Sequence, residues 1–217
     1  MITGDISEAP DLINHLTEIR QGLGSTLPIY FVAGNHDYYN GSIKDVRDQL
    51  TALYGPNNGM NMVWLPACTA PVALTQEVAL VGHDGWYDGL YADWFRSPKL
   101  DMSDYYIIRE LSPQQCPVPQ LRFNQLQVLS QGAADFVRTQ LEEAHKLGFK
   151  KVFVATHVPP FPQLSTYRGK VSDSMWLPCF SSKRMGDMLL DVAGKYAEMK
   201  ITVLCGHSHG KAAYRAA

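Results

Sequence analysis

Histidine, carboxylate and amide side chains follow the ends of several short apolar stretches in this chain. Five of the seven histidines occupy such positions, whereas His15 and His145 lie in segments with a helical pattern. The polar residues at these positions are Asp5, Asn35, His36, Asp37, His83, Asp84, His157, His207 and His209. Neutral imidazole nitrogen together with carboxylate and amide oxygen suits Mn, Fe or Zn. Because no cysteine belongs to this set, a structural zinc finger is not indicated.

A carboxylate such as Asp5 can bridge two cations, which an imidazole cannot readily do. His207 and His209 are two residues apart, so on an extended strand end they face the same side. Two cations ~3.5–4 Å apart suit hydrolysis of a phosphoester, because they activate water and neutralise the phosphoryl oxygens. The residue types therefore predict metal-dependent phosphoester hydrolysis that requires no serine or cysteine nucleophile.

Short apolar stretches rich in β-branched residues must position these side chains. Four of them read "LPIYFVAGNHD", "VALVGHDGW", "KKVFVATHVPP" and "KITVLCGHSHG", and the opening "MIT" is typical of the end of another. Helical patterns of apolar residues lie between them, over residues 11–21, 43–53, 130–147 and 183–199. Strands that alternate with helices predict an α/β fold with helical layers, in which ligands gather at the carboxyl ends of the strands.

Two long segments without this pattern are candidates for substrate contacts. Residues 86–125 are rich in aromatic side chains, and residues 158–182 are rich in proline and serine. Loops of this length inside a domain are often functional. Trp86, Tyr87 and Tyr167 could stack on a base or cover a small organic group, and Arg168 could hold a second phosphate. The alternatives are that the aromatic side chains pack on the core and that the charge is ordinary solvated surface.

The ordered set GDISE, GNHD, the lone histidine in VATHVPP, and GHSH resembles the calcineurin-like metallophosphoesterases. The matches extend from residue 4 to residue 209, and the resemblance implies a layered sandwich of mixed β-sheets flanked by helices. It implies that Asp5 bridges two divalent metals (Mn, Fe or Zn). It further implies that Asn35, His157 and His207 complete one metal site and that His209 serves the other.

The resemblance also implies direct hydrolysis, in which metal-bound hydroxide attacks phosphorus in line. His36 would not bind metal but would protonate the leaving oxygen as a general acid. Glu8 matches the acid that orients this histidine in some members of the family, and Asp37 is the rival orienting residue. A carboxylate beside an imidazole sets the tautomer of the ring and favours its charged form.

The family normally begins with a strand ending in Asp-x-His, and no such motif precedes Asp5. One metal would then have only Asp5 and His209 as ligands, so that site would be weak or empty. We expect residues 1–217 to form a single domain that is incomplete at the N-terminus, and possibly at the C-terminus, with two unpaired sheet edges where the first strand is missing. The alternative is a natural variant: a non-catalytic scaffold or partner-binding domain with an incomplete metal centre.

Composition adds broad limits to these expectations. The 217 residues fit one large domain, and a net charge of −2 with mixed signs gives no indication of a nucleic-acid surface. No apolar stretch approaches the ~20 residues that span a bilayer. Four separated cysteines without a CxxC pair favour reduced thiols. We therefore expect a cytoplasmic enzyme that acts on a small phosphomonoester or phosphodiester.

Overall fold

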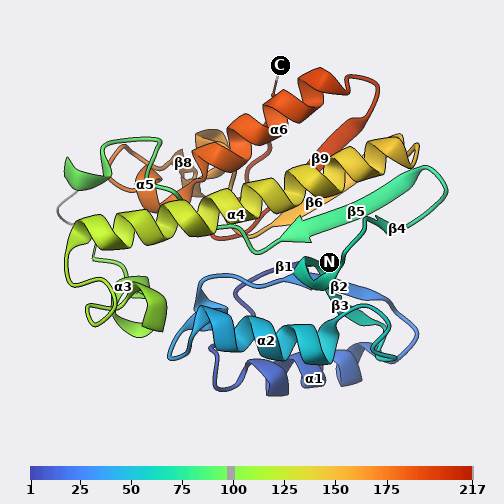
Figure 1. Ribbon diagram of the computed structural model, residues 1–217, viewed down its shortest axis with the longest axis horizontal. Coiled ribbons are helices and arrows are strands. Elements are labelled where there is room, and N and C mark those ends of the chain that lie inside the picture. Colours follow the sequence, from blue (N-terminus) through green and yellow to red (C-terminus); the bar gives the residue numbers. More distant parts are fainter. Residues whose placement is uncertain (97–100, 217) are drawn as a thin grey trace.

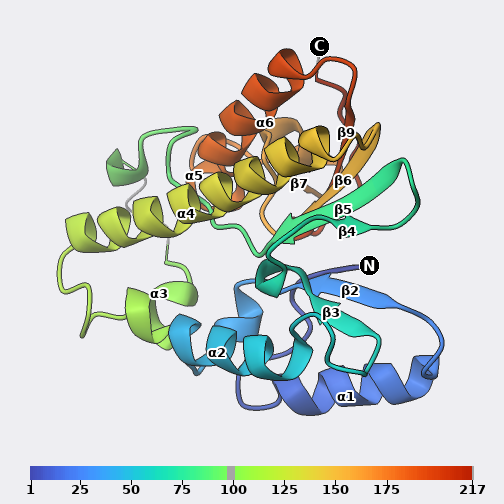
Figure 2. The ribbon, with the colours of Figure 1, turned by 45° about the vertical axis from the view of Figure 1, so that its right-hand side comes forward.

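A computed structural model describes residues 1–96 and 101–216 of the chain. Two β-sheets lie face to face, and helices cover the outer face of each sheet, so the main elements form four layers (Figures 1 and 2). The α/β class predicted from the sequence is therefore confirmed. Residues 97–100, within the predicted long segment 86–125, lie outside the described residues.

The first sheet contains three parallel strands in the order β1-β2-β3. These strands are Ile2–Thr3 (β1), Ile29–Val32 (β2) and Met62–Trp64 (β3). Two helices cover the outer face, Leu12–Leu23 (α1) and Ile43–Tyr54 (α2). The Ser42 hydroxyl accepts a hydrogen bond from the amide of Asp45 and so caps α2. The apolar faces of both helices pack on the sheet around Phe31, as their helical spacing predicts.

The second sheet contains four strands in the order β4-β5-β6-β9. These strands are Val72–Ala73 (β4), Val78–His83 (β5), Lys151–Thr156 (β6) and Lys200–Leu204 (β9). Strands β5, β6 and β9 are parallel, and β4 runs antiparallel to β5, so this sheet is mixed. Two helices cover its outer face, Pro119–Lys146 (α4) and Lys183–Lys195 (α6).

Helix α4 begins well before the segment predicted from apolar periodicity. Pro119 occupies its first turn, where the missing amide hydrogen is not needed. Leu126 and Ser130 are already buried, so the early turns also pack on the core. The prediction that this helix starts at Ser130 was wrong because the apolar residues of its first turns do not keep to one face. Leu126 is buried, whereas Leu121 and Val128 are exposed.

Successive side chains of each strand point to opposite faces of the sheet, and this alternation divides the core into layers. In β5, Ala79 and Val81 face α4 and α6, whereas Leu80 faces the other sheet. Leu80 meets Val32 and Ala155 in a thin apolar layer between the two sheets. Because this layer is thin, the carboxyl ends of the strands in the two sheets lie close together.

Shorter elements complete the described chain. A two-stranded hairpin is formed by Thr166–Tyr167 (β7) and Lys170–Val171 (β8). Two short helices are Asp104–Ile107 (α3) and Leu177–Phe180 (α5). The 3₁₀ turns are His36–Tyr38, Leu65–Ala67, Trp94–Arg96, Arg109–Leu111 and Pro162–Leu164. No helix in the described part of the chain combines the length and the apolar character needed to cross a bilayer.

Candidate metal centre

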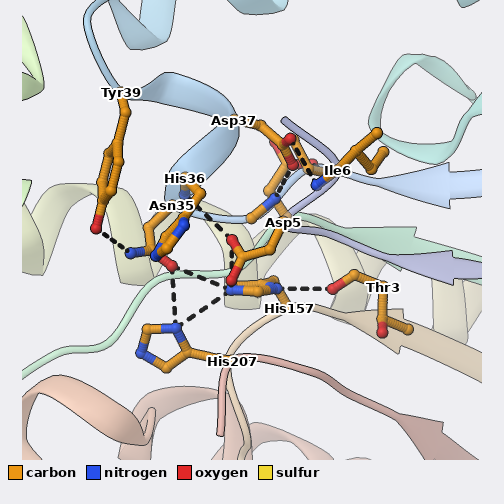
Figure 3. A network of polar contacts seen from close by, with 12 residues as sticks. Thr3, Asp5, Ile6, Asn35, His36, Asp37, Tyr39, His157 and His207 are labelled. Atoms are coloured by element: carbon orange, nitrogen blue, oxygen red, sulfur yellow. Dashed lines mark hydrogen bonds and ion pairs between the residues drawn. The ribbon is translucent and has the colours of Figure 1, made fainter. Parts of the chain in front are cut away.

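Four polar side chains from the two sheets converge at the carboxyl ends of their strands (Figure 3). Asp5 follows β1, Asn35 follows β2, His157 follows β6 and His207 follows β9. Ligand atoms of Asp5, His157 and His207 all lie within 4.8 Å of one another. The Asn35 Oδ1 atom lies 3.1 Å from His157 Nε2 and 3.0 Å from His207 Nδ1. This convergence is what the motifs GDISE, GNHD, VATHVPP and GHSH predict for one metal site.

Glycines at the strand ends make this close approach possible. A Cβ atom on Gly34 would lie 2.6 Å from both Asp5 N and His157 Cε1, and one on Gly4 would lie 2.5 Å from His157 Nδ1. Asp5 and His207 themselves have left-handed backbones, with φ angles of 54° and 64°. Such conformations in residues other than glycine cost ~1–3 kcal/mol each where the structure imposes them, and they cluster at functional sites. Elsewhere in this chain they are adopted by Asn40, Asn57, Asn61 and Arg168. The backbone is therefore strained where two of the candidate ligands lie.

Both histidines use one ring nitrogen to bind a backbone carbonyl. His157 Nδ1 donates to the Thr3 carbonyl at 2.7 Å, and His207 Nε2 donates to the Cys179 carbonyl at 2.8 Å. In the neutral rings, the lone pairs of His157 Nε2 and His207 Nδ1 then face the centre of the cluster. A backbone carbonyl behind the ring is the usual arrangement for a histidine that binds metal.

The four atoms that face one another are Asp5 Oδ1, Asn35 Oδ1, His157 Nε2 and His207 Nδ1. All four are hydrogen-bond acceptors when the two histidine rings are neutral. His157 Nε2 lies 3.3 Å from Asp5 Oδ1 and 3.2 Å from His207 Nδ1. Lone pairs at these distances repel one another unless a proton or a cation lies among them. Ligand atoms bound at ~2.1 Å to one ion lie roughly 3 Å apart when they are at right angles. The donor set and its spacing therefore fit a divalent cation such as Mn, Fe or Zn.

The pKa shifts of Asp5, His157 and His207 indicate that the cluster accommodates one positive charge. Burial would raise the pKa of Asp5, but the contact with His157 outweighs it and lowers the pKa to about 2. Burial disfavours the charged form of His157, yet the contact with Asp5 outweighs burial and raises the pKa of His157. Burial and the charge of His157 lower the pKa of His207 to about 4. A proton on His157 and a cation would therefore compete for the same place.

Asp84 connects the loop that carries Asn35 to the strand that carries His157. Its Oδ1 atom accepts from the Ala33 amide at 2.7 Å and from Trp64 Nε1 at 3.0 Å. Its main-chain carbonyl accepts from the His157 amide at 2.8 Å. Asp84 was noted in the sequence at a strand end, and its observed role is to hold two other strand ends together.

Asp104 is a buried residue near the cluster that sequence reasoning did not single out. Its carboxylate accepts hydrogen bonds from Asn35 Nδ2 at 2.9 Å, the Tyr39 hydroxyl at 2.7 Å and the Tyr87 hydroxyl at 2.8 Å. Burial and the charge of Asp104 raise the pKa of both tyrosines, so their hydroxyls stay protonated and donate. No local sequence signal identifies Asp104, because its partners lie in other segments of the chain.

His36, the predicted general acid, is exposed beside the cluster. Its backbone amide donates to Asp5 Oδ1 at 3.1 Å, and its ring stacks on Tyr39 with 4.4 Å between centroids. Among the described residues, the His36 ring therefore makes no contact that holds the cluster together, whereas its main-chain amide binds Asp5 (Figure 3). A general-acid role for His36 stays a prediction.

The two residues predicted to orient His36 have other partners. The buried Asp37 carboxylate accepts from the amides of Ile6, Ser7 and Gly34 at 2.7–2.8 Å, and so holds the loop that carries Asp5. Glu8 is exposed, and its carboxylate accepts from Asn40 Nδ2 at 2.7 Å. These contacts give Asp37 a structural role in the loop and place Glu8 against Asn40.

Two further histidines lie apart from the four converging side chains. His209 is exposed, whereas His207, two residues earlier, is buried in the cluster. Within the described part of the chain, Asp5, His157 and His207 form the group of acidic, histidine or cysteine side chains that are close enough to share an ion. His83 is buried with Nδ1 accepting from the Gly85 amide. A second cation held by Asp5 and His209 therefore stays a prediction.

The structure corrects the expected substrate role of two aromatic residues. Trp86 and Tyr87 are 2% and 0% exposed and pack in the core that also contains Phe31 of β2, so they cannot stack on a bound substrate. Tyr167 and Arg168 are exposed at the turn between β7 and β8, where the guanidinium lies 5.1 Å from the tyrosine ring. The hairpin packs on the segment after His209, because a Cβ atom on Gly210 would overlap Thr166. Tyr167 and Arg168 remain candidates for substrate contacts.

Comparison of the chain with models of known protein families, with curated proteins and with solved structures finds no match. The chemistry of the site must therefore be argued from the motifs and from the geometry of the converging side chains. The motifs and the geometry agree on four residues, Asp5, Asn35, His157 and His207, whereas His209, which the motifs also imply, lies outside this group.

Proposed function

We propose that this protein is a metal-dependent hydrolase of phosphomonoesters or phosphodiesters, with the fold of the calcineurin-like phosphoesterases. The observation that carries the proposal is the convergence of four acceptor atoms from four separate motifs, at separations of 3.0–3.3 Å between contacting pairs. Four acceptors that face one another need a positive charge among them. A mixture of carboxylate, amide and imidazole ligands suits the divalent cations used in phosphoester hydrolysis.

The side chains of Asp5, Asn35, His157 and His207 would hold the cation. A divalent cation in this position supplies a Lewis acid that polarises phosphoryl oxygens and water. Asn35, His157 and His207 are buried, whereas Asp5 is partly exposed, so the cluster is open to solvent on the side of Asp5. A phosphoryl group would therefore reach the cluster from the side of Asp5 and His36.

His36 would donate a proton to the leaving oxygen. Its ring is exposed on the open side of the cluster, and its main-chain amide bond to Asp5 keeps the residue next to the cation ligands. General acids of this kind contribute typically ~10²–10⁴-fold to the rate. Arg168, exposed on the neighbouring hairpin, would contact a second charged group of the substrate. A cytoplasmic location and a small organic substrate remain predictions.

A non-catalytic role as a scaffold is the second candidate. It is favoured by the position of His209, which is exposed and lies apart from the close group of Asp5, His157 and His207. A protein with one cation site could use the ion only to join its two sheets. Binding and turnover distinguish the two candidates.

The test uses the full chain loaded with Mn²⁺, and the variant Asp5→Asn, which removes the charged ligand at nearly constant shape. We expect the wild type to bind Mn²⁺ in calorimetry and to hydrolyse p-nitrophenyl phosphate or bis-p-nitrophenyl phosphate. Asp5→Asn should lose Mn²⁺ affinity at least ~10-fold. The control Asp48→Asn, which changes an exposed carboxylate paired with Lys44, should behave as the wild type.

Each result decides between the candidates. Binding with turnover that depends on Asp5 supports the hydrolase. Binding without turnover of either ester supports the scaffold. A wild-type protein that binds none of Mn²⁺, Fe²⁺ or Zn²⁺ overturns the cation site and the hydrolase together.

A further inference from the structure

A buried carboxylate, Asp104, lies directly behind the candidate ligand Asn35. It is 0% exposed and begins the short helix α3, in a segment far from Asn35 in the sequence. Its Oδ1 atom accepts from Asn35 Nδ2 and from the Tyr39 hydroxyl, and its Oδ2 atom accepts from the Tyr87 hydroxyl. Three donors from three segments therefore point at one carboxylate.

The contact with Asp104 determines which end of the Asn35 amide faces the cluster. The oxygen and nitrogen ends of an amide have nearly the same shape, so rotation by 180° exchanges them at little steric cost. Only the oxygen can bind a cation, because the NH₂ group is a donor. A carboxylate accepts hydrogen bonds and cannot donate when ionised, so Asp104 selects the orientation in which Nδ2 faces it.

The hydroxyl of Tyr39 reinforces this orientation. It accepts from Asn35 Nδ2 at 3.1 Å and donates to Asp104 at 2.7 Å, so the two NH₂ hydrogens of Asn35 both have acceptors. Reversal of the amide would place its oxygen against the Asp104 oxygen and would turn the NH₂ group toward His157 and His207. Two buried acceptors in contact and a donor at the cation site would both be unfavourable.

Tyr87 extends this support to a second candidate ligand. Its hydroxyl donates to Asp104, and its ring is nearly parallel to that of His207, with 6.1 Å between centroids and 17° between planes. The aromatic segment that carries Tyr87 and Asp104 therefore forms the wall behind the ligands instead of a surface for the substrate.

We propose that Asp104 is a positioning residue for the cation site: it holds the Asn35 amide with Oδ1 toward the cation. The proposal rests on the cation site described under Proposed function but not on hydrolysis. Outer-shell partners of this kind change metal affinity by ~10–100-fold when they are removed. The same range is expected for Asp104.

Two single variants and one double variant test the proposal by Mn²⁺ titration calorimetry of the full chain. Asp104→Asn should lower Mn²⁺ affinity ~10–100-fold, because the Asn35 amide is no longer held in one orientation. Asn35→Asp should also lower the affinity, although a carboxylate is ordinarily a good ligand, because two carboxylates would then face each other. The double variant Asn35→Asp, Asp104→Asn exchanges donor and acceptor, so it should bind Mn²⁺ more tightly than either single variant.

The control is Asp88→Asn, a change of another buried carboxylate. Asp88 accepts from the Arg184 amide and the Ser182 hydroxyl at the start of α6, so it tests the general cost of losing a buried charge. The Mn²⁺ affinity of the Asp88→Asn variant should equal that of the wild type. If Asp104→Asn does not fold, the comparison of Asn35→Asp with the double variant still decides the question.

Three results separate this inference from the cation site itself. Wild-type affinity in Asp104→Asn would overturn the positioning role and leave the cation site intact. A double variant that binds no better than Asn35→Asp would overturn it as well. Absence of Mn²⁺ binding by the wild type would instead overturn the site on which the inference rests.

Discussion

At the scale of single residues, His36 differs from its neighbours in the motif GNHD. Asn35 and Asp37 are buried and fully engaged, whereas the His36 ring is exposed and stacks on Tyr39. Its main chain and its side chain therefore have separate tasks. The amide holds Asp5, and the ring is available for proton transfer.

Replacement of this ring should separate catalysis from cation binding. In His36→Ala the backbone amide still donates to Asp5, so Mn²⁺ affinity should be unchanged. The rate of ester hydrolysis should fall ~10²–10⁴-fold, because the leaving oxygen loses its proton donor. Calorimetry and steady-state kinetics on the same protein preparation measure the two effects.

The matched control is His145→Ala, which removes an imidazole that lies in the last turn of α4 and pairs with Glu198. It should affect neither binding nor rate. Loss of Mn²⁺ affinity in His36→Ala would show that the ring is a ligand, and an unchanged rate would show that it is not the acid.

At the scale of elements, the site depends on how closely the strand ends approach. Gly34 lies between β2 and Asn35, with the Asp5 backbone and the His157 ring against its α-carbon. The Asp37 carboxylate accepts hydrogen bonds from the Gly34 amide and from the Ile6 amide in the loop after β1. The β2 end and the β1 end are therefore one packed unit without room for a methyl group.

Adding that methyl group should disturb the site more than the fold as a whole. Gly34→Ala places a Cβ atom within 2.6 Å of Asp5 N and His157 Cε1, so the strand ends must move apart. We expect ~1–3 kcal/mol lower free energy of unfolding and a loss of Mn²⁺ affinity. Urea unfolding and metal titration measure these two quantities.

Gly132→Ala provides the opposite control, because Gly132 lies within α4 and nothing lies within 4 Å of its added Cβ atom. This change should raise the free energy of unfolding by ~0.5–1 kcal/mol and leave Mn²⁺ affinity unchanged. Wild-type affinity and stability in Gly34→Ala would contradict the close approach of the strands.

At the scale of the whole molecule, the cluster joins the two sheets. Asp5 and Asn35 extend from the first sheet, and His157 and His207 extend from the second (Figure 3). The hydrogen bond between His157 Nδ1 and the Thr3 carbonyl already crosses this boundary. A cation among the four ligands would connect the sheets at the rim, beyond the thin apolar layer between them.

Cation binding should therefore raise the thermal stability of the full chain. At Mn²⁺ concentrations of 100 times Kd, the free energy of unfolding rises by ~2.7 kcal/mol. For a chain of this length the melting temperature rises by roughly 5–10 °C. Scanning calorimetry with Mn²⁺ and with EDTA measures the difference.

The stabilisation should depend on pH with a definite sign. Contact with Asp5 outweighs burial and raises the pKa of His157, so below that pKa a proton occupies the place of the cation. Affinity and the rise in melting temperature should both fall as the pH falls, by up to ~10-fold in affinity per unit. An equal rise at all pH values, or an equal rise in Asp5→Asn, would show that Mn²⁺ binds elsewhere.

Local patterns in the sequence were enough to predict the α/β class and the polar residues that follow β1, β2, β5, β6 and β9, whereas β3, β4 and the hairpin of β7 and β8 were not anticipated. Short β-branched stretches are buried as strands, and the residues after Gly34 and Gly206 must then emerge at strand ends. Parallel strands end at the same rim of a sheet, which anticipates the pairs Asp5 with Asn35 and His157 with His207. That the two pairs belong to one site was implied only by the resemblance to the metallophosphoesterases. The sequence also predicted most helix positions, since their apolar spacing is local.

Contacts between distant segments were decided only by the tertiary structure. The sequence left open whether Trp86 and Tyr87 contact substrate or pack on the core, and the tertiary structure buries them in the core that also contains Phe31. Asp104 reaches Asn35 across 69 residues, and no nearby pattern records that contact. Burial and side-chain partners depend on how remote segments pack together, whereas strand and helix formation depends mainly on neighbouring residues.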